Sequence, residues 1–334
     1  MIKVYIPVTK FAKSSGIGKA TLHQIENLNR IDDVEVTTNL EEADIIHTNF
    51  YGYHYYRLIK KAKKLGKKVV VHAHSTKEDT GHSFRWWPLL LPFLAHSFLK
   101  CYKLGDVIVT PSPYSRSLLL SYPQLKNKEI YAISNGVNLD NYLENKGDFE
   151  GFYQKIQYKK GEKIVMSIGF PFERKGIIEF FEVARKMPDI KFVWLGYLTP
   201  FARPTKINIA IRKKPDNVIM PGYVDLSIIV AALHTASCFF FPTHEETEGI
   251  VVLEALASKT PLVVSDIPVY KDWLTDGLNC YKGHNVDEFV DLINKVLNSD
   301  NTELVNNGYE VVKSKTNIKV TDQMVEVYKS LLNK

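Results

Sequence analysis

Four glutamates and a glycine lie close together in residues 242–257, where they could bind a nucleotide sugar. The segment reads PTHEETEGIVVLEALA, so an aromatic strand ends at Pro242, a polar loop follows, and Gly249 begins an apolar helix. Amide groups at a helix N-terminus bind anions, and glycine lets a ligand approach the backbone closely. Carboxylates accept hydrogen bonds from sugar hydroxyls, so Glu246 and Glu254 suit a sugar linked to phosphate. The alternative is that these acids only cap the helix and complement its dipole.

Glu246 and Glu254 are separated by seven residues, and the segment resembles the E-x7-E signature of the family 4 retaining glycosyltransferases, which have the GT-B fold. The similarity extends through residues 255–257, 261–264 and 276–280. The resemblance implies that Glu246 contacts the donor hexose and Glu254 the ribose hydroxyls. It also implies that the sugar or the distal phosphate is bound by the backbone of Glu248, Gly249 and Ile250.

Two adjacent cations follow another expected strand, in the segment SIGFPFERKG at 167–176. Arg174 and Lys175 at a helix start are able to neutralise a diphosphate and to stabilise the charge that grows on it as a glycosidic bond breaks. A solvated basic helix start is the alternative. The family usually has an arginine after the first glycine of this segment and a lysine before the second. Lys175 matches, but Phe170 stands at the arginine position, so Arg174 is the expected substitute.

The loop after the first expected strand contains Gly16 and Gly18, which permit a tight turn against phosphate. A lone pair of glycines is a common pattern, and the third glycine of a dinucleotide-binding fingerprint is missing. The resemblance implies that this loop faces the donor phosphate and the acceptor.

His72 and His74 lie at the end of the strand expected at 68–74. Histidines near strand ends are often structural, but the family typically has one here, close to the reacting sugar. The resemblance therefore implies that His74, with His72 as the second choice, bonds to the donor sugar and positions the acceptor. The loop at 112–115, with Ser115, and the loop at 134–138 also resemble loops of the family's cleft, although structural turns are an equal alternative.

Transfer in this family is described as front-face, with the leaving diphosphate helping to deprotonate the acceptor hydroxyl. The resemblance thus implies no metal ion and no cofactor, and the UDP-sugar is a co-substrate. The chain has no D-x-D pair of the metal-dependent kind. Its three cysteines, Cys101, Cys238 and Cys280, form no C-x-x-C pair, which argues against a zinc site or a disulfide framework and fits a reducing cytosol.

The elements that position these residues alternate between short apolar strands and helices. Near-continuous apolar strands between helices predict parallel sheets covered on both faces. We expect an α/β protein with two doubly wound Rossmann-like domains facing an inter-domain cleft, and a ligand at the strand C-termini. The expected strands are 2–8, 34–39, 44–49, 68–74, 106–111 and 129–134 in the first half, and 163–169, 190–196, 217–222, 238–242 and 261–265 in the second.

The 334 residues suit about two domains. We expect an acceptor- and membrane-facing domain at 1–145 and a nucleotide-sugar-binding domain at 163–315. The polar, glycine-containing stretch at 146–162 predicts a linker. The last segment, 316–334, is expected to be a helix that packs back toward the N-terminal domain.

The first half has a strongly basic region, with fourteen Lys and Arg residues against three Asp and Glu residues between 57 and 128. Such an excess implies an anionic partner. Seven of these cations lie within 57–68, and residues 84–104 form an apolar segment too short and too rich in proline to span a membrane. A buried crossover helix and a solvated helix face are the alternatives. The side chains expected at a membrane–water interface are Arg85, Trp86, Trp87 and Lys100.

A sugar-transfer site beside a membrane-docking surface predicts a lipid acceptor. The sequence is most similar to bacterial glycolipid synthases of the diglycosyl-diacylglycerol synthase type. We therefore expect a hexosyltransferase that moves glucose or galactose from a UDP-sugar to monoglucosyl-diacylglycerol with α retention, at the inner face of the cell membrane. The alternatives are a polysaccharide or undecaprenyl-linked acceptor, a nucleotide-sugar epimerase, and a basic nucleic-acid-binding protein, which no nucleic-acid module supports. The sequence does not predict an oligomeric state.

Overall fold

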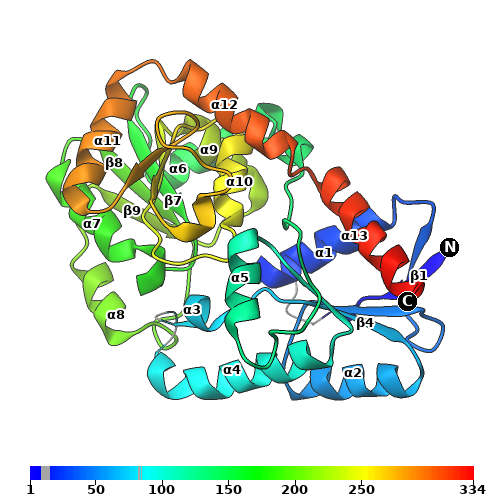
Figure 1. The fold of residues 1–334 in the computed structure, drawn as a ribbon. Coiled ribbons are helices and arrows are strands. Elements are labelled where there is room, and N and C mark those ends of the chain that lie inside the picture. Colours follow the sequence, from blue (N-terminus) through cyan, green and yellow to red (C-terminus); the bar gives the residue numbers. More distant parts are fainter. Residues whose placement is uncertain (9–15, 82, 84) are drawn as a thin grey trace. The chain divides into compact units, whose positions relative to one another are not determined.

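The computed structural model describes residues 1–8, 16–81, 83 and 85–334, and the chain folds into two compact units. Unit 1 comprises residues 1–80, 89–136 and 317–334, and unit 2 comprises residues 81–88 and 137–316. Each unit contains one six-stranded sheet in which all paired strands are parallel (Figure 1). The α/β class with two doubly wound sheets is therefore confirmed.

The sheet of unit 1 has the order β2-β1-β3-β4-β5-β6. Its strands are β1 (Ile2–Tyr5), β2 (Val34–Thr37), β3 (Ile45–Thr48), β4 (Lys68–His72), β5 (Val107–Thr110) and β6 (Ile130–Ala132). The helices of this unit are α1 (Gly16–Leu28), α2 (Tyr53–Lys64), α3 (Lys77–Thr80), α4 (Trp87–Leu104), α5 (Pro113–Ser121) and α13 (Asn317–Leu332). Gly16 and Gly18 thus lie in the first turn of α1, while residues 13–15 of the expected phosphate loop lie outside the described residues.

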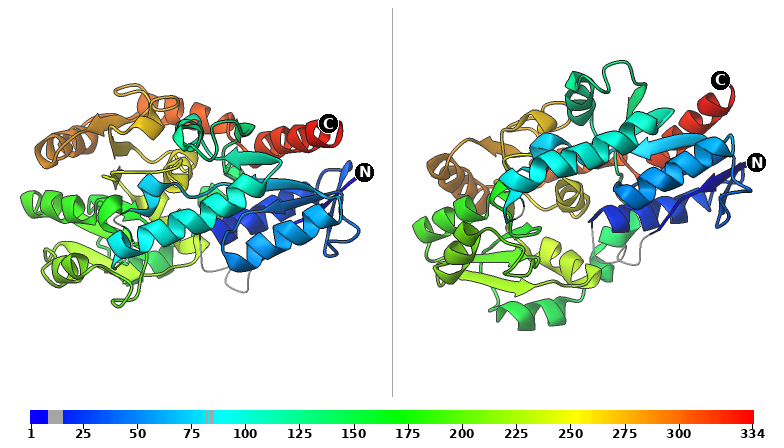
Figure 2. Two further views of the ribbon diagram at one scale, coloured as in Figure 1. Left: turned by 60° about the horizontal axis from the view of Figure 1, so that its bottom comes forward. Right: turned by 90° about the horizontal axis from the view of Figure 1, so that it is seen from below.

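Helices cover both faces of this sheet because successive strand residues point to opposite sides. Helices α2, α4 and α5 pack on the face that includes Ile46 and Val69, and α1 and α13 pack on the face that includes Ile45 and Val70. Figure 2 shows α2 and α4 running along the same side of the sheet. The C-terminal helix α13 is therefore part of unit 1, beside α1.

The sheet of unit 2 has the order β12-β11-β10-β7-β8-β9. Its strands are β7 (Ile164–Ile168), β8 (Lys191–Leu195), β9 (Val218–Gly222), β10 (Cys238–Phe241), β11 (Leu262–Ser265) and β12 (Tyr281–Gly283). The α-helices are α6 (Phe149–Ile156), α7 (Ile177–Lys186), α8 (Thr205–Arg212), α9 (Leu226–Thr235), α10 (Ile250–Ala257), α11 (Val286–Asn298) and α12 (Thr302–Lys313). Short 3-10 turns are η2 (Leu139–Tyr142), η3 (Glu144–Lys146), η4 (Glu173–Lys175) and η5 (Pro268–Tyr270).

Residues 146–162, which we expected to form a linker, instead contribute helix α6 to unit 2. Phe152 and Ile156 are fully buried, and α6 packs on α9. A Cβ atom on Gly151 would lie 2.9 Å from the side chain of Ile228 on α9. This glycine, which we counted as evidence for a linker, therefore allows close helix packing.

Residues 85–104 of the expected apolar segment are divided between a short irregular stretch and helix α4. Helix α4 begins only at Trp87, and Trp86 has a left-handed backbone with φ of 58°. The backbone amide of Arg85 donates a hydrogen bond to the carbonyl of Ala202, so this short stretch belongs to unit 2. The left-handed backbone of Trp86 cannot continue into a right-handed helix, so α4 begins at the next residue.

Candidate functional site

The loops that carry the predicted donor-site residues come from the two central strands of unit 2. The strand order reverses between β7 and β10, and in open α/β sheets ligands bind beyond the strand C-termini at this point. Arg174 and Lys175 follow β7, and Glu246 follows β10. A Cβ atom on Gly176, which has φ of 74°, would lie 1.9 Å from the carbonyl oxygen of Pro242. Only glycine permits this close approach of the two loops.

Glu246 is the centre of an ion cluster formed by these loops. Its side chain is only 7% exposed, and its Oε1 atom pairs with the Lys175 ammonium and lies 3.6 Å from Arg174 Nη1. The Thr243 hydroxyl donates a further hydrogen bond of 2.9 Å to the same oxygen. The structure thus brings together the three charged residues that the sequence predicted at 174, 175 and 246.

The two cations keep this buried carboxyl ionised. Burial acts to raise the pKa of Glu246, but the charges of Lys175 and Arg174 and the hydrogen bonds from Lys175 and Thr243 outweigh it, so the pKa is lowered. A buried charge without such partners would be strongly unfavourable. A carboxylate held in this way is a hydrogen-bond acceptor, and the side chains of Arg174 and Lys175 are themselves 13% and 15% exposed.

Arg174 is fixed by contacts that its position in the sequence does not reveal. Its Nε atom donates to the Ser83 hydroxyl at 2.8 Å, and its Nη1 atom donates to the carbonyl of Glu245 at 3.0 Å. Its own carbonyl accepts a hydrogen bond of 2.7 Å from the amide of His244. Phe170, at the family's arginine position, is 37% exposed. The guanidinium of Arg174 therefore lies in the ion cluster with Glu246, and its role in place of the family's arginine stays a prediction.

Helix α10 positions the remaining predicted donor residues. Gly249 precedes it with φ of 90° and, as a glycine, offers no side-chain cap. Glu248 is 1% exposed and lies 3.7 Å from the Lys315 ammonium, whereas Ile250 is partly exposed. The Glu254 carboxylate accepts a hydrogen bond of 2.7 Å from the Tyr142 hydroxyl. Sequence reasoning missed Tyr142 because η2 lies in a polar stretch without helical or strand periodicity.

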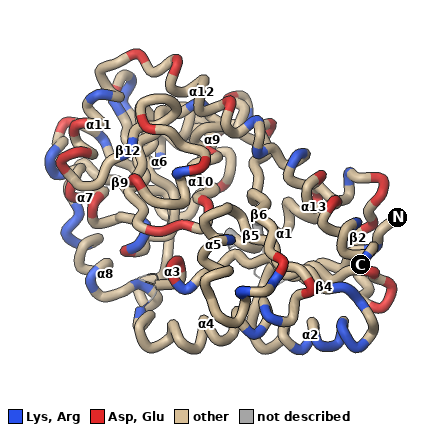
Figure 3. Tube along the Cα trace, viewed as in Figure 1, with Lys and Arg blue, Asp and Glu red and all other residues tan. Residues whose placement is uncertain are grey.

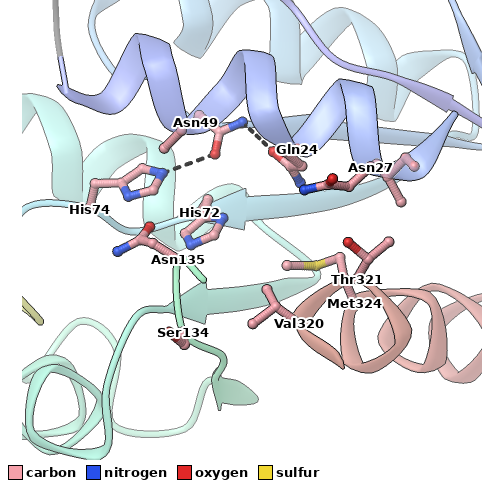
Figure 4. A pocket seen from close by; sticks show the side chains of 12 residues that line it. Gln24, Asn27, Asn49, His72, His74, Ser134, Asn135, Val320, Thr321 and Met324 are labelled. Carbon is pink, nitrogen blue, oxygen red and sulfur yellow. Dashed lines mark hydrogen bonds between the residues drawn. The ribbon is translucent and has the colours of Figure 1, made fainter. Parts of the chain in front are cut away.

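Unit 1 contains a second polar site, a pocket of about 30 Å³ at the C-terminal edge of its sheet (Figure 4). The rings of His72 and His74 stack with centroids 4.1 Å apart. The Nε2 atom of His74 is 2.9 Å from Asn49 Oδ1, whereas neither ring nitrogen of the buried His72 has a hydrogen-bond partner among the described residues. The other lining residues are Ala20, Gln24, Asn27, Leu28, Ser134, Asn135, Val320, Thr321 and Met324.

The histidines of this pocket are held neutral. Desolvation lowers the pKa of His74 to about 4, and desolvation with the charge of His74 lowers the pKa of the neighbouring His47 to about 3. The pKa of His72 is also well below its usual value, by burial and by the two neighbouring histidines. A neutral imidazole both donates and accepts a hydrogen bond, which suits a hydroxylated ligand.

The residues predicted on the acceptor side do not form one cluster. Ser115 is fully buried and completes the capping box of α5 with Ser112, so its hydroxyl is used structurally and we no longer place it at the acceptor. Trp86 is 53% exposed and packs edge-on against Phe201 of unit 2, with Arg85 over its ring. Trp87 is half-buried at the start of α4, and Lys100 is exposed on the same helix.

The exposed apolar side chains of α4 are ones that the sequence analysis did not single out. Leu89 is 72% exposed, Leu90 42% and Phe93 75%. Helix α2 lies alongside, since the ring of Tyr56 has Lys60 at 5.3 Å and Lys100 of α4 at 5.8 Å. Figure 3 shows the row of Lys and Arg along α2. One face of unit 1 therefore carries both apolar and basic side chains.

Membrane-spanning helices and clustered metal ligands are both absent from the described part of the chain. In residues 1–8, 16–81, 83 and 85–334, no helix is long and apolar enough to cross a membrane. Across the same ranges, no group of three or more His, Cys, Asp or Glu side chains is placed to hold a metal ion.

Known proteins identify the class to which this fold and this site belong. The family described as "Glycosyl transferases group 1" matches residues 148–311, and "Glycosyltransferase Family 4" matches residues 20–141. The processive diacylglycerol alpha-glucosyltransferase of Acholeplasma laidlawii is 41% identical over 334 residues, which cover 99% of this chain and 98% of that protein. The chain is a glycosyltransferase and belongs to the family that these two descriptions and this relative define, as its E-x7-E segment indicated.

Solved structures agree on the fold. Sucrose-phosphate synthase from Thermosynechococcus elongatus matches with a TM-score of 0.76 and 15% identity. The match covers 100% of this chain and 99% of the synthase chain. Anabaena HepE in complex with UDP and glucose matches with a TM-score of 0.74 and 14% identity, over 99% of this chain and 100% of the HepE chain. The GT-B fold class is thereby confirmed.

The neutral histidines predict that unit 1 loses stability in mild acid. Their folded pKa values lie below the unfolded value of about 6.5, so unfolding takes up protons and the free energy of unfolding falls as pH drops through that value. At pH 5 the loss is about 2 kcal/mol for each of His47 and His74, by the same linkage. Urea denaturation at pH 7.5 and at pH 5 measures this loss in the free energy of unfolding. His72→Phe, which cannot take up the proton, should show a smaller loss, and an equal loss would contradict this cause.

Proposed function

We propose that this glycosyltransferase moves a hexose, glucose or galactose, from a UDP-sugar to monoglucosyl-diacylglycerol at a membrane surface, with retention of the α configuration. The observation that carries the proposal is the cluster of Lys175, Arg174 and Glu246 at the switch point of unit 2. The 41% identical relative is named for glucosyl transfer to diacylglycerol, which supports a lipid acceptor.

Each donor-site residue has a chemical task in this proposal. Glu246 accepts hydrogen bonds from the hexose hydroxyls, and Glu254 accepts them from the ribose. The backbone of Glu248, Gly249 and Ile250 contacts the sugar or the distal phosphate. The cations Arg174 and Lys175 bind the diphosphate and stabilise the negative charge that it gains when the bond to the sugar breaks.

The acceptor oxygen attacks the anomeric carbon from the face that the diphosphate leaves, and the diphosphate oxygen takes the acceptor's proton. We extend the proposal to His74 of unit 1, whose neutral imidazole is able to bond to a sugar hydroxyl. No protein nucleophile is required in this scheme. Gly16 and Gly18 are proposed phosphate contacts by the family resemblance.

The face of α2 and α4 is proposed to dock on the membrane, with the protein peripherally attached on the cytoplasmic side. Apolar side chains such as Leu89 and Phe93 would enter the interface, while the cations of α2 would face anionic headgroups. Each cation near an anionic surface contributes about 1 kcal/mol before screening. Arg85, Trp86, Trp87 and Lys100 remain proposed contacts, with Trp86 presented by unit 2.

The acceptor is tested with mixed vesicles that contain monoglucosyl-diacylglycerol and with labelled UDP-glucose or UDP-galactose. We expect a labelled diglycosyl lipid with one of the two donors. The control vesicles lack the acceptor lipid. Transfer only to a polysaccharide or an undecaprenyl-linked precursor would contradict the lipid assignment and leave the donor assignment intact.

Variants of the donor site should separate binding from turnover. Glu254→Ala is expected to raise the KM for the UDP-sugar about tenfold with little change in kcat, because it removes uniform binding. Lys175→Ala is expected to lower kcat about 100-fold, since its charge stabilises the transition state most. Lys186→Ala, whose ammonium pairs with Asp287 on the surface, is the control. Unchanged kinetics in both site variants would remove the donor-site assignment.

The docking face predicts a membrane-specific defect. The double variant Leu89→Ser with Phe93→Ser should bind anionic vesicles at least about 100-fold more weakly, because each apolar side chain loses about 1.5–3 kcal/mol of burial in the lipid. Vesicle co-sedimentation measures this loss. The control is Ile209→Ser, which changes an apolar side chain on α8 that is 48% exposed. Equal vesicle binding by the double variant and wild type would show that this face does not dock.

A further inference from the structure

Tyr270 is a fully buried tyrosine at the C-terminal edge of the second sheet. It ends η5, the short turn that follows β11, the strand next to β10. The ring packs edge-on against Trp273 with centroids 5.6 Å apart. The carbonyl of Tyr270 accepts hydrogen bonds from the amides of Trp273 and Leu274, so the backbone that carries the ring is fixed.

The hydroxyl of Tyr270 is buried but has no hydrogen-bond partner among the described residues. Other buried tyrosines of this chain are satisfied: the hydroxyl of Tyr102 donates to the Ser75 carbonyl at 3.0 Å, and that of Tyr142 donates to Glu254. An unpaired buried hydroxyl destabilises the folded state, since it has lost its bonds to water. Such a group calls for a physical reason.

The position of the hydroxyl supplies that reason. A Cβ atom built on Gly249 would lie 2.9 Å from the Tyr270 oxygen, closer than to any ring carbon, so the hydroxyl is directed at the residue that precedes α10. This eight-residue helix has no acidic residue in its first turn and no side-chain cap. Its amides and the Tyr270 hydroxyl are therefore hydrogen-bond donors at one place.

The electrostatic surroundings keep this hydroxyl a donor. Burial and the nearby negative charge of Glu246 raise the pKa of Tyr270 well above its usual value, so the proton stays on the oxygen. A neutral donor beside helix amides favours a ligand that only accepts hydrogen bonds and carries negative charge, which describes a phosphate.

We propose that the Tyr270 hydroxyl donates a hydrogen bond to the distal phosphate of a nucleoside diphosphate or its sugar ester, at the N-terminus of α10. The inference rests on the proposed function and adds a further binding residue to that site. The bond forms when the diphosphate enters, and it then satisfies the buried hydroxyl of Tyr270. The site therefore sacrifices some stability for ligand binding.

The variant Tyr270→Phe tests this assignment because stability and binding should change in different directions. We expect its thermal midpoint without ligand to equal or exceed that of the wild type. Its Kd for UDP, measured by calorimetry, should rise about tenfold, since a hydrogen bond to a charged group is lost. Its Kd for UMP, which lacks the distal phosphate, should change less than about twofold, because the contact that the variant removes is to that phosphate.

Tyr102→Phe is the matched control, because it removes a buried hydroxyl that has a partner in unit 1. It should lower the thermal midpoint and leave the Kd for UDP unchanged. The inference is overturned if Tyr270→Phe binds UDP like the wild type, if UDP and UMP weaken equally, or if its midpoint falls as in Tyr102→Phe. Failure of the wild type to bind UDP would instead contradict the proposed function.

Discussion

The buried carboxylate of Glu246 is the constraint on which the rest of the proposed donor site depends. Its charge is tolerable only because Lys175 and Arg174 face it from the neighbouring loop. The same pairing holds the two cations in place, which would leave little reorganisation for the diphosphate that we propose they bind. The electrostatics that stabilise this part of the fold are thus also suited to the charge that develops during transfer.

The fold of unit 2 makes this pairing possible through backbone contacts rather than side-chain packing. The loops after β7 and β10 meet at the point where the strand order reverses, and Gly176 lets them approach to a distance that no other residue allows. Helix α10 then presents Glu254, which Tyr142 orients, while η5 places Tyr270 behind Gly249. Three strand ends therefore contribute to one polar site.

The sequence predicted every strand of the first sheet and five strands of the second, and it singled out the three charged residues, because β-branched apolar runs and the spacing of acids and cations are local patterns. It missed β12, α6 and the break before α4. Gly151 in α6 serves close packing, and the stretch before α4 is held by a hydrogen bond from the Arg85 amide to the carbonyl of Ala202, far along the chain. Tyr142, Ser83 and Tyr270 could not be predicted, since their partners are brought to them only by tertiary structure. The burial of Ser115 likewise follows from its cap rather than from its place in a loop.

Binding of a UDP-hexose at this cluster in unit 2 is the central claim. A crystal structure of the protein with UDP-glucose or UDP-galactose bound tests it most directly. We predict the distal phosphate within hydrogen-bond distance of the Lys175 ammonium and a hexose hydroxyl within the same distance of the Glu246 carboxylate. A nucleotide sugar bound elsewhere, with the Lys175 and Glu246 pair untouched, would contradict the claim.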